Sequence, residues 1–442
     1  MASRRPRVVV LGGGFGGLAT VHALRHADAD VVLVDKRNHH LFQPLLYQVA
    51  TASLDESDIA APIRGVLRWQ KNAFVVLSTA ESIDLDNKRI MCAGMDDGSP
   101  EPLPFDWLVI ATGARHAYFG HDDWAARAPG LKTIEDAINL RSRFLLAFEN
   151  AEVEGDEAAR QAELTFVIVG GGPTGCELAG SMAQCARQSM PRDFRGIDTR
   201  TAKIILIQGG DRILPQFCER TSKRAHRILT KMGVEIRLGN NVTDITDEGV
   251  FVGDEFIPAG NVFWAAGVQA PSITRTLGVE VDRVGRIPVG GDCAIEGHPN
   301  VFAIGDVASV TCAKTGKPVP GVAQGALQMG RHVGRIIAGE LQGGTGNRPL
   351  FTYRDKGSLA TLGRGKAVAD IWGLSLGGVA AWFVWAVVHI MFLVGFRNKI
   401  SVMTQWGMQG LLRQRGARLI QGEDEVRVKL PALPSDRTDR HG

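Results

Sequence analysis

The sequence of 442 residues predicts an α/β protein with two similar βαβ units and a C-terminal helical region. Three observations support this prediction. A Val/Ile/Leu strand, a glycine-rich turn and an apolar-spaced helix follow one another near the N-terminus and again near residue 164. The 53 glycines gather at the ends of such strands and form no repeat. Near the C-terminus, residues 373–396 contain no Asp, Glu, Lys or Arg.

The first βαβ unit carries the G-x-G-x-x-G spacing of a dinucleotide fingerprint. Gly12 permits a tight turn, Gly14 lets a diphosphate approach the backbone, and Gly17 lets helix and strand pack closely. Asp35, eighteen residues beyond Gly17, ends the second strand and would accept hydrogen bonds from ribose hydroxyls. The alternative is a glycine turn in an ordinary βαβ unit. Further expected members of this site are Phe15, Gly16 and Lys36.

The second unit repeats the fingerprint but lacks its acidic residue. Its turn residues are Gly170, Gly172, Thr174 and Gly175. Gln208 stands at the end of the second strand, where a carboxylate is expected. Losing that carboxylate removes a repulsion against a 2′-phosphate, and Arg212 is close enough in sequence to approach one. This site is therefore expected to take NADH or NADPH.

Several strands outside the fingerprints also end in glycine. One ends in Thr112 and Gly113, another ends at Gly267, and a third is followed by Gly305 and Asp306. Asp306 is expected to bind a cofactor hydroxyl, with a simple helix N-cap as the alternative. Two nucleotide units in one chain suit one held flavin and one transient nicotinamide, because hydride transfer requires their rings to stack closely.

Charge and cysteine content exclude several classes of protein. The net charge of +3 is scattered along the chain, so no nucleic-acid partner is expected. The six cysteines form no C-x-x-C pair, so neither a metal site nor a disulfide framework is predicted. The apolar run after Arg7 is too short for a signal peptide, which favours a catalytic part in the cytoplasm.

The uncharged stretch 373–396 is long enough to cross a bilayer, since roughly 20 apolar residues suffice. A single crossing would place the following arginines opposite the catalytic part, against the positive-inside tendency. Tryptophans and the flanking Arg397 and Lys399 suit a helix that lies in the interface, which is the favoured interpretation. A buried helix is the third alternative. The polar residues 423–442 are expected to be disordered.

The paired fingerprints, with ATGA at 111–114 and AIGD at 303–306, resemble the two-dinucleotide flavoprotein reductases. Within that group, residues 7–420 are most similar to type II NADH dehydrogenases, the single-subunit NADH:quinone oxidoreductases. The narrower resemblance rests on LFQPLLYQVA, GGGPTGCE, AQGALQ and the aromatic C-terminal segment. It implies FAD in the first unit, a nicotinamide coenzyme in the second, and two-electron reduction of a membrane quinone without proton pumping.

The resemblance also implies roles for particular residues. Ala323, Gln324 and Gln328 match a helix that the family places beside the flavin at the quinone pocket. The i,i+4 spacing puts both glutamines on one helix face, which could instead be a solvated face. Glu177 matches a glutamate near the nicotinamide, and helix-dipole stabilisation is its alternative role. Residues 43–48 match a stretch beside the isoalloxazine ring.

The expected domains are 1–115 with 290–345 for FAD, 116–289 for NAD(P)H, and 346–422 for membrane anchoring. The expected partners are a membrane quinone and the bilayer surface, which residues 373–412 would contact; a homodimer is compatible with the sequence. The chain is placed peripherally on the cytoplasmic face of a bacterial inner membrane.

Two other functions stay open. A sulfide:quinone oxidoreductase resembles this fold but needs redox cysteines, for which Cys176 and Cys312 are weak candidates. The C-x-x-x-x-C pair of disulfide reductases is absent from residues 39–51. A flavin-bound signalling or interaction protein is the alternative outside enzymes.

Overall fold

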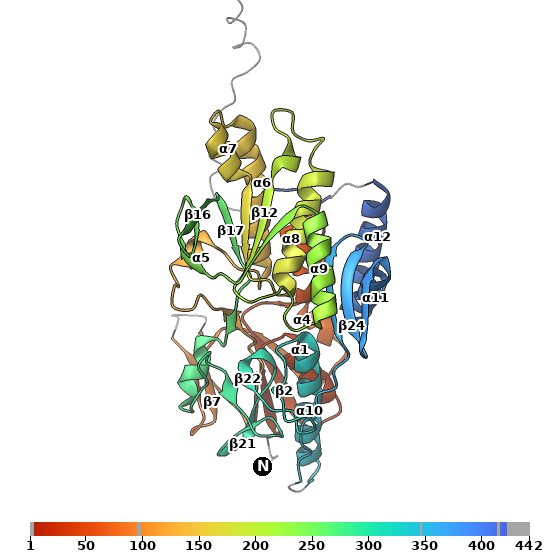
Figure 1. The fold of residues 1–442 in the computed structure, drawn as a ribbon. Coiled ribbons are helices and arrows are strands. Elements are labelled where there is room, and N and C mark those ends of the chain that lie inside the picture. The colour runs from red at the N-terminus through yellow and green to blue at the C-terminus, as the bar shows by residue number, and fades with distance from the viewer. Residues whose placement is uncertain (1–3, 95–98, 345–346, 413–415, 422–442) are drawn as a thin grey trace, which may run out of the picture. The chain divides into compact units, whose positions relative to one another are not determined.

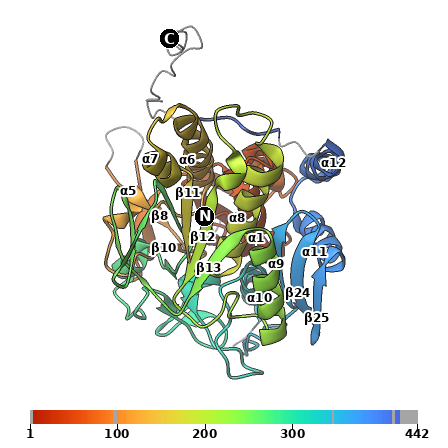
Figure 2. The same ribbon diagram turned by 45° about the horizontal axis from the view of Figure 1, so that its top comes forward.

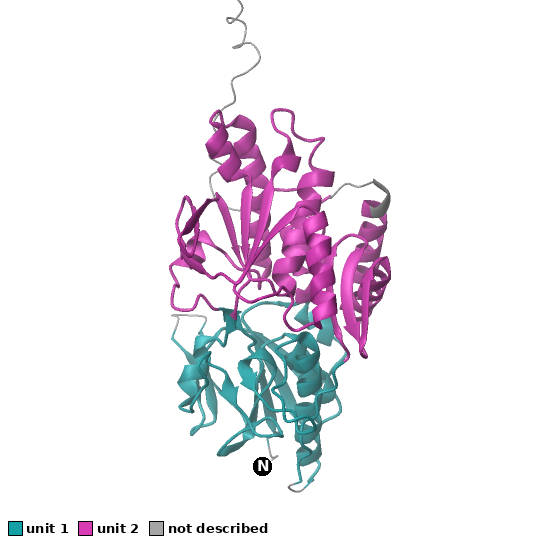
Figure 3. Cartoon of the chain, viewed as in Figure 1, with its two compact units in different colours: residues 1–41, 60–116, 268–355 teal, residues 42–59, 117–267, 356–442 magenta. Residues whose placement is uncertain are grey.

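The computed structural model describes residues 4–94, 99–344, 347–412 and 416–421. The chain forms two compact units, which Figure 3 distinguishes by colour. Unit 1 comprises residues 1–41, 60–116 and 268–355, and unit 2 comprises 42–59, 117–267 and 356–442. Residues 42–59 therefore group with unit 2, although the sequence assigned them to the FAD-binding domain. The domain assignment itself concerns nucleotide binding and stays a prediction. The expected disorder of 423–442 lies outside the described residues.

Unit 1 is built on a mainly parallel sheet of buried hydrophobic strands. The strand order is β20 (Ala294–Ile295), β21 (His298–Ala303), β9 (Trp107–Ile110), β1 (Arg7–Leu11), β2 (Asp30–Asp35) and β5 (Ala73–Leu77). In β1, Val8 lies opposite Val31 of β2 on one side and Trp107 of β9 on the other. The residues of β1 from Val8 onward are buried, as expected for the centre of a parallel sheet.

Two helices of unit 1 carry the predicted site residues and pack tightly against each other. They are α1 (Phe15–Ala23) and α10 (Ala323–Leu341). A Cβ atom at Gly330 would lie 2.3 Å from the carbonyl oxygen of Gly16, so glycine is required for this approach. The Thr20 hydroxyl donates to the carbonyl of Gly330 at 3.2 Å. Unit 1 also contains β3 (His39–Leu41), β4 (Ala60–Pro62), α4 (Ile63–Leu67), β6 (Ala80–Asp84), β7 (Arg89–Cys92), β8 (Glu101–Pro104), β10 (Arg115–His116), β18 (Val268–Gln269), β19 (Ile287–Pro288) and β22 (Ala308–Ser309).

Unit 2 contains a second parallel sheet, visible in Figure 1 beside its helices. The strand order is β13 (Val234–Leu238), β12 (Lys203–Gln208), β11 (Thr165–Val169) and β17 (Asn261–Trp264). Helix α8 (Pro173–Gln184) follows β11, as the second βαβ unit predicted. Other elements are α2 (Leu46–Ala50), α3 (Glu56–Ile59), α5 (Trp124–Arg127), α6 (Ile134–Val153), α7 (Glu157–Glu163), α9 (Glu219–Lys231), β14 (Val242–Ile245), β15 (Gly249–Val252) and β16 (Glu255–Pro258).

The C-terminal region of unit 2 begins with strands and not with a helix. An antiparallel sheet of β23 (Ser358–Gly363), β24 (Lys366–Ile371) and β25 (Leu374–Gly378) precedes α11 (Val379–Phe392) and α12 (Phe396–Leu412). Both views place α11 beside β24, with α12 following next to α11 (Figure 2). The hairpin between β24 and β25 turns at Trp372 and Gly373, which both have positive φ. The predicted C-terminal helical region is present as α11 and α12, and a three-stranded sheet that the sequence did not indicate precedes it.

The uncharged stretch 373–396 is thus divided between β25, α11 and the turn into α12. Across the described residues, no helix combines the length and the apolar character needed to cross a bilayer.

Candidate nucleotide and quinone sites

The first glycine turn has the backbone geometry that a bound diphosphate requires. Gly12 has φ +104°, and a Cβ atom there would lie 2.4 Å from the carbonyl oxygen of Ala111. A Cβ atom at Gly17 would lie 1.8 Å from the carbonyl oxygen of Gly12. Gly14, at the N-cap of α1, has nothing within 4 Å of the same position. Free space above Gly14 and the N-terminus of α1 together suit an anionic group.

Two side chains hold this turn in place. Asp35 accepts hydrogen bonds from the N–H groups of Gly13 at 2.6 Å and Arg37 at 2.7 Å. His40 contacts the carbonyl oxygen of Gly13 through Nδ1 at 2.9 Å, and its ring packs edge-on against Phe15 at 5.1 Å. Burial lowers the pKa of His40, so the neutral ring donates this bond. The sequence did not identify His40, and Lys36 is exposed beside Asp35.

Unit 1 also has buried polar atoms that other described residues leave unpaired. Thr112 Oγ1 and Gln324 Oε1 are shielded from solvent and have no hydrogen-bond partner among the described residues. A solvent-connected cavity of about 720 Å³ is lined by Gly305, Asp306, Gly321 and Ala326 among others. Buried polar atoms are normally hydrogen-bonded, so these two oxygens are available to a polar ligand. The residues present therefore fit a dinucleotide cofactor.

The two glutamines of α10 differ in what they are free to bind. The side-chain amide of Gln328 donates to the carbonyl of Arg354 at 3.0 Å and accepts from its N–H at 3.0 Å. Gln324 keeps an unpaired oxygen, and Ala323 begins the helix. Gln328 therefore braces the chain at Arg354, whereas Gln324 has capacity for a ligand. Spacing alone did not distinguish them.

The second glycine turn, in unit 2, matches the first closely. Gly170 has φ +110°, and a Cβ atom at Gly175 would lie 1.9 Å from the carbonyl oxygen of Gly170. Gly172 has nothing within 4 Å of the same position, and Thr174 lies in the first turn of α8. Gln208 Oε1 accepts the N–H of Gly171 at 2.7 Å, as Asp35 does from Gly13. Since its oxygen is used in this way, Gln208 presents N–H donors where a carboxylate would present acceptors.

Glu177 lies deep in unit 2, although part of its side chain is exposed to solvent. Thr361, on β23, donates its backbone N–H to Glu177 Oε1 at 3.4 Å. Burial is the largest influence and raises the pKa of Glu177 to about 8, while the bond from Thr361 opposes this effect. At neutral pH the carboxyl therefore holds a proton.

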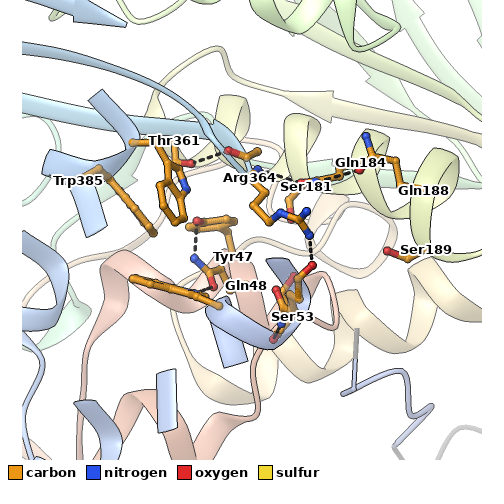
Figure 4. A pocket seen from close by; sticks show the side chains of 14 residues that line it. Tyr47, Gln48, Ser53, Ser181, Gln184, Gln188, Ser189, Thr361, Arg364 and Trp385 are labelled. Carbon is orange, nitrogen blue, oxygen red and sulfur yellow. Dashed lines mark hydrogen bonds between the residues drawn. The ribbon is translucent and has the colours of Figure 1, made fainter. Parts of the chain in front are cut away.

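A second cavity of about 590 Å³ lies within unit 2, open to solvent and amphipathic (Figure 4). Trp382, Trp385, Trp406 and Tyr47 form aromatic walls. The polar lining includes Gln48, Ser53, Ser181, Gln184, Gln188, Ser189, Thr361, Arg364 and Gln409. The indole N–H of Trp385 is buried without a hydrogen-bond partner among the described residues. The sequence indicated only residues 43–48, because the other walls come from α8, β23, α11 and α12.

Helix α12 turns several polar side chains inward, beside the buried Val402, and exposes large apolar side chains. Asp58, which is buried, accepts hydrogen bonds from Ser401 Oγ and Gln405 Nε2, both at 2.6 Å. Trp406 donates its indole N–H to Gln48 Oε1 at 2.8 Å. Large apolar side chains of α11 and α12 are instead exposed, namely Val379, Phe383, Val387, Met391, Phe392, Phe396, Ile400, Met403 and Met408.

The two cysteines considered for sulfur chemistry are both buried but differ in their hydrogen bonds. Cys176 is fully buried, and burial raises the pKa of its thiol, which disfavours the nucleophilic thiolate. At Cys312, a hydrogen bond from the Thr315 side chain is the largest influence that lowers the thiol pKa, to about 7. Its sulfur also accepts the N–H of Tyr353 at 3.3 Å.

Two known protein families together match nearly the whole chain. Residues 6–330 match the pyridine nucleotide-disulphide oxidoreductase family, and residues 356–415 match the NDH2 C-terminal domain. The type II NADH:quinone oxidoreductase Ndh of Mycobacterium tuberculosis is 42% identical over 450 residues, covering 99% of this chain and 96% of that protein.

Solved structures give the same architecture. NDH2 from Plasmodium falciparum in complex with NADH superposes with a TM-score of 0.85 at 20% identity, over 95% of this chain and all of that one. The sulfide:quinone oxidoreductase of Aquifex aeolicus gives 0.70 at 18% identity, over 92% and 96%. At these identities the likeness concerns the fold alone.

Proposed function

The chain belongs to the type II NADH:quinone oxidoreductase family, and from this premise we propose that it oxidises NADH and reduces a membrane quinone. The observation that carries the proposal is the pair of matching glycine turns in one chain. One turn is completed by a carboxylate and the other by an amide. Such a pair supports one resident and one exchanging dinucleotide.

Unit 1 is the proposed FAD site. The glycine turn Gly12–Gly17 with Phe15 and Gly16 would hold the diphosphate, and Asp35 the ribose. The Thr112 hydroxyl would bond a polar group of the cofactor, and Gln324 Oε1 would accept a hydrogen bond from a cofactor N–H or hydroxyl. When bound, FAD supplies a two-electron carrier between nicotinamide and quinone. The further proposed members of the site are Lys36, Gly113, Gly305, Asp306 and Ala323.

Unit 2 is the proposed coenzyme site, with Gly170, Gly172, Thr174 and Gly175 at the diphosphate and Gly267 at the end of β17. The side-chain N–H groups of Gln208 can donate to a ribose hydroxyl or to a 2′-phosphate, whereas a carboxylate would repel the phosphate. We therefore assign use of both NADH and NADPH. Arg212 donates to the carbonyl of Pro215 at 3.1 Å, which leaves other guanidinium N–H groups for a phosphate.

Quinone reduction consumes protons, and Glu177 is the proposed holder of one of them. Its raised pKa keeps the carboxyl protonated near neutral pH, and the Thr361 N–H orients it. Gln324 is the proposed quinone contact of α10, with Gln328 as its support. The amphipathic cavity of unit 2 offers a route for an oil-soluble ring, because its aromatic walls accommodate apolar carbon and its amides can meet carbonyl oxygens.

The apolar outer face of α11 and α12 is the proposed contact with the bilayer surface. An exposed apolar patch of this extent marks an interaction site, and the flanking Arg397 and Lys399 suit anionic headgroups. The enzyme would then be peripheral, on the cytoplasmic face of a bacterial inner membrane, and would transfer electrons without pumping protons. A second copy of the chain is the alternative occupant of this face.

Anaerobic stopped-flow absorbance of the FAD-loaded protein tests the proposal. NADH should bleach the flavin, a short-tailed quinone should restore its colour, and both phases should be at least as fast as steady-state turnover. Sulfide in place of NADH serves as the control donor. Bleaching by sulfide but not by NADH would instead identify a sulfide oxidoreductase. Bleaching by NADH with negligible quinone-dependent recovery would favour a signalling role.

A further inference from the structure

Phe119 is an apolar side chain held in a conformation that bulky residues avoid. Its φ is +54°, in the left-handed region where a non-glycine residue is strained. Its side chain is also 69% exposed, so burial of the ring does not compensate for the strain. Strained residues of this kind persist where the surrounding structure enforces them, often at ligand sites. The position of the ring therefore requires an explanation.

Neighbouring groups fix the loop, and the largely exposed Phe119 ring lies tilted beside Trp264, with ring centres 6.2 Å apart. The indole N–H of Trp264 donates to the carbonyl of Ala117 at 3.0 Å, and Tyr118 stacks on Trp264 with ring centres 5.0 Å apart. Gly267 has φ +84°, and a Cβ atom there would lie 2.4 Å from Phe119 Cζ. The Phe119 ring thus lies directly against a glycine that no other residue could replace without displacing the ring.

Gly267 lies just beyond the carboxyl end of β17, next to the glycine turn. A Cβ atom at Gly170 would lie 2.6 Å from the carbonyl carbon and oxygen of Ala265. The sheet order β13-β12-β11-β17 places β12 and β17 on opposite sides of β11. In such sheets a dinucleotide lies across the carboxyl ends of the strands, with its diphosphate at the glycine turn.

The two halves of a dinucleotide are therefore assigned to opposite sides of β11. Gln208 ends β12, the side on which the adenosine ribose is recognised. The other half must then extend toward the end of β17, where Gly267 and Phe119 lie. We infer that the exposed ring of Phe119 packs against the nicotinamide half of the coenzyme and positions it. This inference rests on the proposed function.

The test compares two variants of Phe119 with a matched control. Phe119→Asn removes the ring, and asparagine tolerates positive φ, so the loop should keep its conformation. Phe119→Tyr keeps the ring. Phe256→Ala removes another exposed phenylalanine of unit 2, 40% exposed on β16. The readouts are the Kd of NADH, from the concentration dependence of flavin reduction, and the Ki of ADP, which lacks the nicotinamide half.

We expect Phe119→Asn to raise the Kd of NADH about tenfold, which corresponds to about 1.4 kcal/mol. The Ki of ADP should stay within twofold, and Phe119→Tyr and Phe256→Ala should match the parent protein in both constants. An unchanged Kd in Phe119→Asn overturns the inference, and so does equal weakening of NADH and ADP. Failure of the proposed function is distinguishable, because the parent protein would then show no flavin reduction by NADH at all.

Discussion

Replacing Glu177 by glutamine should stabilise the protein, and the gain should grow with pH. Below pH 4.5 the carboxyl is protonated in both the folded and the unfolded chain, so it does not favour unfolding. As the pH rises, the unfolded carboxyl ionises first, while the folded one keeps its proton up to a pKa of about 8. The free energy of unfolding therefore falls across this window and levels off above pH 8.

The size of the effect follows from the two pKa values. Each pH unit between 4.5 and 7 lowers the free energy of unfolding by roughly 1.4 kcal/mol, or about 3 kcal/mol in total at pH 7. Part of the Glu177 side chain is accessible, so solvent reduces this cost, and we expect about 2 kcal/mol. Glutamine keeps an acceptor for the Thr361 N–H and cannot ionise.

Urea denaturation followed by tryptophan fluorescence at pH 5 and pH 8 provides the assay. The midpoint of Glu177→Gln should move to higher urea relative to the parent at pH 8 and only slightly at pH 5. Glu248→Gln, at an exposed position of the same unit, controls for the general effect of removing a charge. A gain that is the same at both pH values would refute the reasoning, because it could not arise from the ionisation of Glu177.

Three further substitutions test the remaining assignments. Gln324→Ala should slow quinone reduction at least tenfold and leave flavin reduction by NADH within twofold in stopped-flow traces; equal loss in both half-reactions would contradict its role as a quinone contact. Gln208→Glu should raise the NADH/NADPH ratio of kcat/KM about tenfold, through a new ribose bond and repulsion of the 2′-phosphate; an unchanged ratio would remove Gln208 from the coenzyme site. Asp58→Ala should cost about 1–3 kcal/mol, because the donors Ser401 and Gln405 lose their acceptor, and should speed proteolysis within α12; unchanged cleavage would show that Asp58 does not hold this helix.

The glycine turns could be predicted from the sequence because their chemistry is local. The spacing of Gly12, Gly14 and Gly17 after a hydrophobic strand specifies a turn in which Gly17 packs against the backbone of Gly12, whereas the approach of Gly12 to Ala111 also needs the neighbouring strand. Asp35 ends β2, the next strand in the sequence, which lies beside β1 in the parallel sheet. These features depend on the order of the residues and on little else, so the structure reproduces the expected geometry in both units.

Contacts between segments that are distant in the sequence could not be predicted from residue spacing. The spacing of Gln324 and Gln328 placed both on one helix face, yet only the structure brings Arg354 to Gln328. The sequence gives no reason to choose between the adjacent His39 and His40 as the contact of the glycine turn. The role of His40 depends on where β3 meets this turn. The hairpin at Trp372 and Gly373 was missed because Trp is unusual at positive φ.

Helix α12 shows how a hydrophobicity pattern can mislead when polar side chains find their hydrogen-bond partners inside the protein. The sequence assigned the membrane contact to residues 373–412 as a whole and did not indicate which face of the last helix would make it. In the structure Ser401, Gln405 and Trp406 turn inward, where Asp58 and Gln48 accept their hydrogen bonds, and apolar side chains such as Met403 and Met408 are exposed. In water, exposing the apolar face would cost about 25 cal/mol for each Å² left uncovered. We expect the bilayer surface to cover this face, so vesicle co-sedimentation should weaken when Met403 and Met408 are both changed to Gln while the polar contacts of Asp58 are kept.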